Sequence, residues 1–198
     1  METVVLASGS ETRKSMLLAA GVSFEILPAA IDEEEIKAAL LAEGSDSAFM
    51  AEALAEHKAR VVSRKLPTAL VIGSDQILEC GNNIYSKPVD VAAAKDQLSA
   101  LRGKDHELIS SVVVYRNNQR LWHHTDRALL RMRVFSDEFL DSYVSELGAE
   151  LFQGPGSYRI EGQGIQLFSK ITGDHFTILG LPLLPLLDYL RLQGAIAE

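Results

Sequence analysis

The segment from Val4 to Gly21 places the strongest constraint on the fold. Val4-Val5-Leu6-Ala7 is a short, β-rich apolar run, which predicts one buried strand. The small residues Ser8-Gly9-Ser10 follow it, and apolar residues then recur at helical spacing until Gly21. A strand, a tight turn and a helix in this order direct the N–H groups of the helix N-terminus toward the space above the turn. Such an arrangement is typical of an α/β protein and favours an anion above the turn.

The rest of the chain mixes strands and helices without the strict βαβ order of a fully parallel sheet. Further strands are expected at 22–27, 70–73, 108–115, 121–134, 165–171 and 176–179. Helices are expected from Asp32 onward and at 45–65, 90–101, 136–147 and 181–192. We therefore expect a mixed α/β fold, in which helices cover both faces of a mixed, twisted sheet. Because no linker or repeat divides the chain, we expect a single domain over residues 1–198.

The net charge restricts the partners of the chain. Its 198 residues include 19 Lys or Arg and 27 Asp or Glu, which gives a formal net charge of −8. Nucleic-acid polymers are bound through many Lys and Arg contacts with phosphates, so no such partner is expected, whereas a small anion needs only a local positive cluster. The single cysteine, Cys80, excludes an internal disulfide, and the apolar run 178–187 is too short to span a membrane. We expect a cytoplasmic protein with no membrane partner.

Polar side chains at the expected strand ends are the candidates for chemistry. Ser8 and Arg13 follow the first strand, Asp75 follows the strand at 70–73, and Lys87 and Lys58 come from a loop and a helix. Ligands of open α/β sheets gather at the carboxyl ends of strands, so these groups can share one site. Cations and helix amides favour a phosphate chain, and an aspartate beside them holds Mg²⁺ or activates water. The residues alone do not distinguish an enzyme with a phosphate-containing ligand from a nucleotide-binding module or a purely structural module.

A series of short motifs runs in order along the chain. They are Leu6-Ala7-Ser8-Gly9-Ser10-x-x-Arg13, Asp32-Glu33, Lys58-Ala59, Ile72-Gly73-Ser74-Asp75-Gln76, Lys87-Pro88, His106, Gly156-Ser157-Tyr158-x-Ile160-Glu161-Gly162 and Gly180-Leu181-Pro182-Leu183. Together they resemble the Maf family of nucleoside triphosphate pyrophosphatases over nearly the whole chain. The sequence departs from the usual family pattern at Glu11-Thr12, where Pro-Arg is typical, and at His57, where Glu is typical.

This resemblance implies a fold of two lobes around a central cleft, similar to that of inosine triphosphate pyrophosphatases. It implies hydrolysis of a nucleoside triphosphate between the α and β phosphates with Mg²⁺ or Mn²⁺, by a cytoplasmic homodimer. By the same resemblance Asp75 is the catalytic residue, and Glu33 falls on an acid of the family's cleft. Mg²⁺ prefers one or two carboxylates, so we expect Asp75 and Glu33 as metal ligands, and the neighbouring acids Asp32, Glu34 and Glu35 are the alternatives to Glu33. Ser8, Arg13, Lys58 and Lys87 fall on the positions that bind the triphosphate.

The residues at three positions point to a substrate branch within the family. Gln76 and Glu161 resemble the branch that acts on 7-methyl-GTP, whereas Thr12 stands where that branch tends to have an aromatic residue. A carboxylate such as Glu161 can accept the paired N–H donors of a guanine edge, and it favours the positive charge of the methylated ring. We expect 7-methyl-GTP as substrate. The alternatives are a dTTP or UTP pyrophosphatase of the same family, and a nucleotide-binding regulator of septum formation in cell division.

Overall fold

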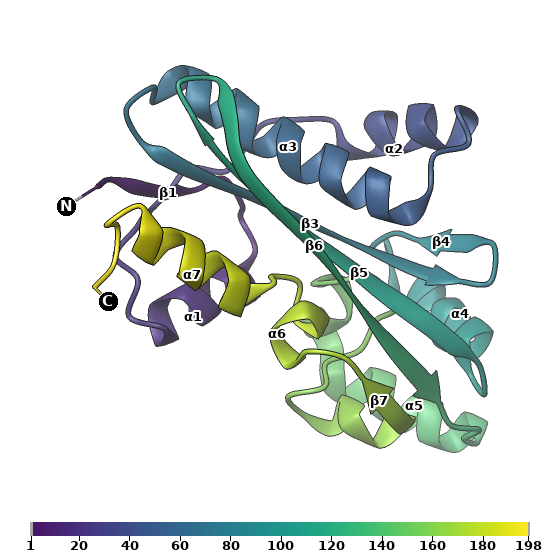
Figure 1. Ribbon diagram of the computed structural model, residues 1–198. Helices are drawn as coiled ribbons and strands as arrows, with labels where there is room; N and C mark the ends of the chain where they lie inside the picture. The colour runs from purple at the N-terminus through teal and green to yellow at the C-terminus, as the bar shows by residue number, and fades with distance from the viewer. Residues whose placement is uncertain (1, 198) are drawn as a thin grey trace. The chain divides into compact units, whose positions relative to one another are not determined.

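The structure is a computed structural model and describes residues 2–197 (Figure 1). By its internal contacts the described chain divides into two compact units, which agrees with the two lobes expected. Unit 1 comprises residues 2–76, 109–127 and 174–197, and unit 2 comprises residues 77–108 and 128–173. Residues 1 and 198, the ends of the expected domain, lie outside the described residues.

Strands from along the whole chain form one mixed sheet. The strands are β1 (Val4–Leu6), β2 (Glu25–Ile26), β3 (Leu70–Cys80), β4 (Asn83–Tyr85), β5 (Asp105–Arg116), β6 (Gln119–Met132) and β7 (Phe168–Thr172). Their order is β2-β1-β3-β5-β6-β7, and β4 pairs with β3. Strand β1 is parallel to both β2 and β3, whereas β4 and β7 pair antiparallel with β3 and β6. The expectation of a mixed sheet is therefore confirmed.

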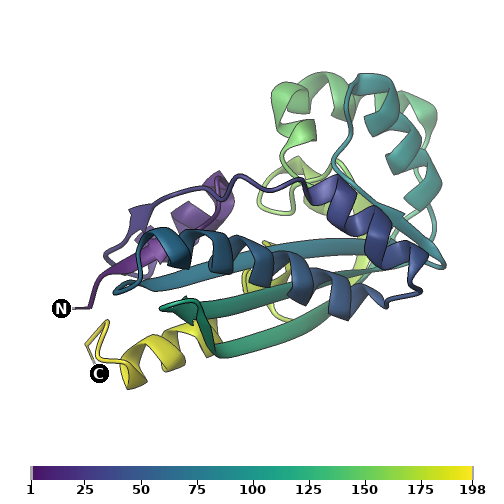
Figure 2. The same ribbon diagram turned by 90° about the horizontal axis from the view of Figure 1, so that it is seen from above.

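Helices cover both faces of the sheet in unit 1 (Figures 1 and 2). The helices of this unit are α1 (Glu11–Ala19), α2 (Glu33–Ala42), α3 (Ser47–Lys65), α6 (His175–Ile178) and α7 (Leu183–Leu192). Leu6 and Ile72 point into a core shared with α1 and α7, whereas their strand neighbours Val5 and Val71 point into a second core, against α3. This alternation follows from the two-residue period of a strand. Burial on both faces also explains why β1 and the first residues of β3 are continuous apolar runs.

Unit 2 is built around the remaining parts of β3, β5 and β6. It contains α4 (Val91–Leu101), α5 (Asp137–Leu147) and two 3-10 helices, η1 (Gly148–Phe152) and η2 (Gln163–Leu167). Asp90 and Ser136 cap α4 and α5, because each side chain accepts a hydrogen bond from the backbone three residues further on. Leu98 and Leu101 of α4 are fully buried. None of the helices in residues 2–197 is long and apolar enough to cross a membrane.

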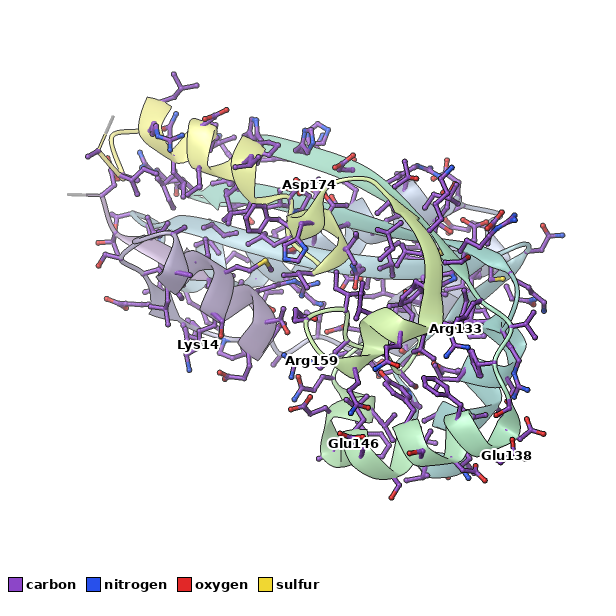
Figure 3. The ribbon with its side chains drawn as sticks, turned by 90° about the horizontal axis from the view of Figure 1, so that it is seen from below. Lys14, Arg133, Glu138, Glu146, Arg159 and Asp174 are labelled. Atoms are coloured by element: carbon purple, nitrogen blue, oxygen red, sulfur yellow. The ribbon has the colours of Figure 1, made fainter. Side chains whose placement is uncertain are left out.

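Of the expected strands, the one at 176–179 is wrong and the one at 165–171 is only partly right. The expected strand at 176–179 is the helix α6, because the side chain of Asp174 (labelled in Figure 3) accepts hydrogen bonds from the amides of Phe176 and Thr177 and so caps a helical turn. The expected strand at 165–171 begins as η2, and only Phe168–Thr172 pairs with β6. Short apolar runs have no period that distinguishes a strand from a buried turn of helix.

Candidate active site

A buried lysine joins two carboxylates in unit 1. Lys58 lies in the middle of α3, and its side chain is only 8% exposed. Its Nζ atom donates a hydrogen bond to Asp75 Oδ1 at 2.6 Å and forms an ion pair with Glu33 Oε1 at 2.9 Å. Removing Lys58 and Asp75 from water costs free energy, which these short charge-assisted contacts offset. Because both carboxylates reach the same ammonium group, their oxygens lie within two hydrogen-bond lengths of each other.

Gly73 allows α3 to approach β3 closely enough for this contact. A Cβ atom at Gly73 would lie 2.1 Å from the carbonyl oxygen of Ala55 and 2.8 Å from the amide nitrogen of Ala59, both in α3. Such distances are shorter than van der Waals contact, so only glycine fits. Lys58 lies between Ala55 and Ala59 along the helix, and Asp75 is two residues beyond Gly73 in β3. Residues two apart in a strand face the same side, so Asp75 faces the helix that Gly73 admits.

The turn after β1 fixes the position of Arg13. The side chain of Ser10 caps α1 by accepting a hydrogen bond from the Arg13 amide. The guanidinium group donates through Nη1 to Ser8 Oγ at 3.3 Å and through Nε to the carbonyl oxygen of Gly180 at 2.8 Å. Arg13 is therefore held from two sides, by the turn that precedes its helix and by a main-chain carbonyl from near the other end of the chain.

Arg13 belongs to the same electrostatic group as Lys58. Burial lowers the pKa of Arg13, and the negative charges of Asp75 and Glu33 act in the opposite direction. We refer to Arg13, Glu33, Lys58 and Asp75 as the charged cluster. It holds two cations against two carboxylates, so the cluster has no large net charge of its own.

The structure distinguishes Glu33 from the acidic residues beside it. Asp32 is the N-cap of α2 and accepts a hydrogen bond from the Glu35 amide. Glu34 pairs with Lys37 one helical turn away. Glu33, by contrast, extends its carboxylate to Lys58.

Asp75 does not follow the end of a strand, which corrects the expectation from the sequence. Strand β3 continues through Ser74, Asp75 and Gln76 as far as Cys80. Each of the three polar side chains has a partner inside the fold: Ser74 Oγ donates to the Gly180 carbonyl at 3.0 Å, Asp75 pairs with Lys58, and Gln76 donates to backbone carbonyls of α6. Buried polar groups that are satisfied in this way do not interrupt a strand.

A family model described as Maf-like protein matches residues 3–193. The chain belongs to the Maf family. It is 50% identical over 190 residues to the nucleoside triphosphate pyrophosphatase of Paramagnetospirillum magneticum, which covers 96% of this chain and 98% of that protein. It is 46% identical over 193 residues to the 7-methyl-GTP pyrophosphatase of Rhizobium meliloti, which covers 98% of this chain and 97% of that protein. The nucleoside triphosphate pyrophosphatase of Granulibacter bethesdensis is 47% identical over 193 residues, or 98% of both chains. The resemblance to the Maf family is thereby confirmed.

The residues expected to form the Maf site are distributed over both units. Ser8 and the charged cluster lie together in unit 1, as do Thr12 on α1 and Gln76 on β3. Lys87, an exposed residue between β4 and α4, belongs to unit 2. Glu161 also belongs to unit 2, where its carboxylate lies 3.6 Å from Nη2 of Arg159. Arg159 is labelled in Figure 3.

The donor set of the Maf chain suits a divalent cation shared with phosphates. Within residues 2–197 no three His, Cys, Asp or Glu residues are grouped so that they could hold a metal ion by themselves. Two carboxylates, those of Asp75 and Glu33, do converge on a single cation, the Lys58 ammonium. Mg²⁺ typically binds one or two carboxylates together with substrate phosphates and water, so these two residues fit such an ion.

Sequence reasoning missed the groups that hold Arg13 from the C-terminal side. The carbonyl oxygen of Gly180 accepts from both Arg13 and Ser74, and Gly180 has a φ of +96°. Gly180 is part of a sequence motif with Leu181 and Pro182, but the direction of its main-chain carbonyl cannot be inferred from residue types. Its role depends on where the backbone points.

Proposed function

We propose that this Maf-family chain is a nucleoside triphosphate pyrophosphatase. It cleaves the link between the α and β phosphates of its substrate and releases a nucleoside monophosphate and pyrophosphate. The observation that carries this function is the charged cluster, in which two buried cations lie beside two carboxylates. The names of the Maf relatives support the same reaction.

The cations of unit 1 bind the triphosphate in this proposal. Arg13 and Lys58 are already fixed by hydrogen bonds, so they change little when the phosphates bind. Attack on phosphorus builds negative charge on the phosphate oxygens, and fixed positive charges stabilise that charge without reorganisation. The hydroxyl of Ser8 and the ammonium of Lys87 complete the proposed set of phosphate-binding groups.

Asp75 is the proposed general base. Its carboxylate accepts a proton from a water molecule while the water oxygen attacks phosphorus, and pyrophosphate leaves with the electrons of the broken P–O bond. Lys58 holds Asp75 Oδ1, which orients the carboxylate and leaves its second oxygen for the water.

A divalent cation, Mg²⁺ or Mn²⁺, is the proposed cofactor. Asp75 and Glu33 would hold it. When bound, it supplies positive charge to the phosphate oxygens of the leaving group. Lys58 contacts both of these carboxylates, so a metal ion held by them would share them with its ammonium group.

We propose 7-methyl-GTP as the substrate, with Thr12, Gln76 and Glu161 as the residues that determine this choice. The carboxylate of Glu161 offers two acceptors to the N–H donors of the base and a negative charge to the methylated ring. Relatives that carry the name 7-methyl-GTP pyrophosphatase support this choice. We further propose that the two units work as one Maf-like domain, and that the protein is a cytoplasmic homodimer.

Pyrophosphate release from a panel of nucleotides tests this function. The panel contains 7-methyl-GTP, GTP, dTTP, UTP, and inosine and xanthosine triphosphates, each with Mg²⁺, with Mn²⁺ and with EDTA. We expect release with metal, none with EDTA, and the highest kcat/KM for 7-methyl-GTP. A higher kcat/KM for dTTP or UTP would identify the other branch of the family. No release from any nucleotide would contradict the proposed enzymatic activity. The remaining alternative would then be a nucleotide-binding regulator of cell division.

A further inference from the structure

The carbonyl oxygen of Gly180 connects Arg13 to the rest of unit 1. It accepts hydrogen bonds from Arg13 Nε at 2.8 Å and from Ser74 Oγ at 3.0 Å. A bond to Nε fixes the plane of a guanidinium group, because Nε lies where that plane joins the side chain. The bond to Gly180 uses Nε and the bond to Ser8 uses Nη1, which leaves the Nη2 group of Arg13 for a ligand.

Gln76 holds the segment that presents this carbonyl. Its Nε2 atom lies 3.1 Å from the carbonyl oxygen of Thr177 and 3.0 Å from that of Ile178, the last residues of α6. The carbonyls at the end of a helix have no partner within the helix, so these bonds tie the end of α6 to β3. Gly180 follows two residues later, and a Cβ atom there would lie 3.4 Å from Arg13 Nη2 and 3.6 Å from Gln76 Oε1.

Ser110 strengthens the same connection from β5. It is fully buried, its Oγ atom donates to the Thr177 carbonyl at 2.8 Å, and it accepts from Gln76 Nε2 at 3.0 Å. The hydroxyl of Thr177 in turn donates to Asp126 Oδ2 at 2.8 Å. The short helix α6 is therefore bound to three strands through its end and its side chain.

We propose that Gln76 and Ser110 are positioning residues for the triphosphate site. They fix the end of α6, α6 fixes the Gly180 carbonyl, and that carbonyl orients Arg13 toward the phosphates. This inference rests on the proposed function. It gives Gln76 a role at the phosphates in addition to its proposed part in the choice of substrate, because its amide nitrogen bonds to Ser110 and to the end of α6.

Inorganic triphosphate is the probe that separates this role from recognition of the base, because it has phosphates and no base. We expect Gln76→Met and Ser110→Ala to weaken its binding about tenfold each by calorimetry, the effect of losing about one hydrogen bond's net contribution. In Ser110→Ala nucleotides should lose affinity by the same factor, so the ranking of substrates in the panel should not change for this variant. KM should rise more than kcat falls, since the phosphates are held in both the ground state and the transition state.

Ser111→Ala is the matched control. Ser111 is also fully buried and follows Ser110 in β5, but its Oγ atom contacts the His124 carbonyl and Thr125 instead of α6. This variant should bind inorganic triphosphate as the unmodified protein does. Melting temperatures of all variants identify any loss of folding, and if Gln76→Met does not fold, Ser110→Ala carries the test.

The Arg13→Lys background tests whether Gln76 and Ser110 influence triphosphate binding by positioning Arg13. A lysine has no Nε donor for the Gly180 carbonyl, so Gln76→Met and Ser110→Ala should cause less than about a twofold further loss in this background. Three results would each overturn the positioning role: unchanged triphosphate binding in the single variants, a changed substrate ranking in Ser110→Ala, or a full further loss of triphosphate binding when either substitution is added to Arg13→Lys. Failure of the proposed function is read separately, as the absence of pyrophosphate release by the unmodified protein.

Discussion

At the scale of single residues, Asp75 has the most specific role in the charged cluster. Asp75→Asn keeps the size of the side chain but removes the negative charge and the ability to accept a proton from water. We expect kcat to fall by about 10²–10⁴-fold, the usual contribution of a general base. Binding of inorganic triphosphate should change little, because Arg13 and Lys58 remain. Pyrophosphate release and calorimetry measure the two quantities.

Asp188→Asn serves as the control for Asp75→Asn. Asp188 lies on α7, its side chain is 77% exposed, and it pairs with Arg191 at 2.7 Å. This variant should turn over at the rate of the unmodified protein. A fully active Asp75→Asn protein would remove Asp75 from the role of base.

Glu161 is the residue that we propose recognises the base. Glu161→Gln keeps one acceptor but places an N–H donor against the N–H groups of guanine and removes the charge that favours the methylated ring. We expect kcat/KM to fall about tenfold for 7-methyl-GTP and to change little for UTP. Glu150→Gln is the matched control, because Glu150 is the other carboxylate paired with Arg159, at 2.8 Å. An unchanged ranking of substrates in Glu161→Gln would contradict recognition of the base by this residue.

At the scale of elements, the contact between α3 and β3 builds the site. Gly73→Ala would put a methyl group 2.1 Å from the carbonyl oxygen of Ala55, so the helix must move away from the strand. We expect the free energy of unfolding to fall by about 3 kcal/mol, the upper end for added volume in a packed core. The folded fraction should also lose activity, because Lys58 moves from Asp75. Urea denaturation and pyrophosphate release measure these effects.

Gly154→Ala shows what a methyl group does where there is room. A Cβ atom at Gly154 would have no atom within 4 Å. This variant should keep both stability and activity. A Gly73→Ala protein as stable as the Gly154→Ala protein would show that α3 and β3 tolerate a wider separation.

The elements that the sequence predicts well are those with local signals. Asp90 and Ser136 were expected to begin helices and do so, because a cap depends only on the next three residues. The turn at Asn117-Asn118 lies between the strands expected at 108–115 and 121–134, and asparagine tolerates the positive φ that both residues adopt. The length of β3 could not be predicted, because Ser74, Asp75 and Gln76 look like a turn until their distant partners are known. The same holds for the site: its side chains were predicted from motifs, but the Gly180 carbonyl and Ser110 act through contacts between remote segments.

At the scale of the whole molecule, acid is expected to destabilise the fold through His106. This residue of β5 is 2% exposed, and burial lowers its pKa from 6.5 to about 4. Between these two values the unfolded chain binds a proton that the folded chain does not, so stability falls as the pH drops from about 6.5 to about 4. The loss attributable to His106 is at most about 3 kcal/mol. Urea denaturation at a series of pH values measures it.

Two variants separate the titration of His106 from its hydrogen bond. His106→Phe removes the imidazole and should flatten the pH dependence in this window. Tyr158→Phe removes the hydroxyl that lies 2.8 Å from His106 Nε2 but leaves the imidazole buried, so the slope should remain. An undiminished slope in His106→Phe would assign the acid sensitivity to other groups.

The bond between Arg13 and Gly180 has a consequence for synthesis of the protein. The two residues are 167 positions apart, so a growing chain that has already made α1, β1 and the strand carrying Asp75 still lacks the acceptor for its arginine. Contacts between such remote segments form late, because a long loop must close before they gain anything. A ribosome that stops before Gly180 thus releases a chain with every charged residue of the cluster, in which Arg13 has its contact with Ser8 but lacks its acceptor at Gly180. Hydrolysis by the chain would therefore show that the last segment has been synthesised and has packed onto the rest of unit 1. A stability measurement on a fragment does not show this.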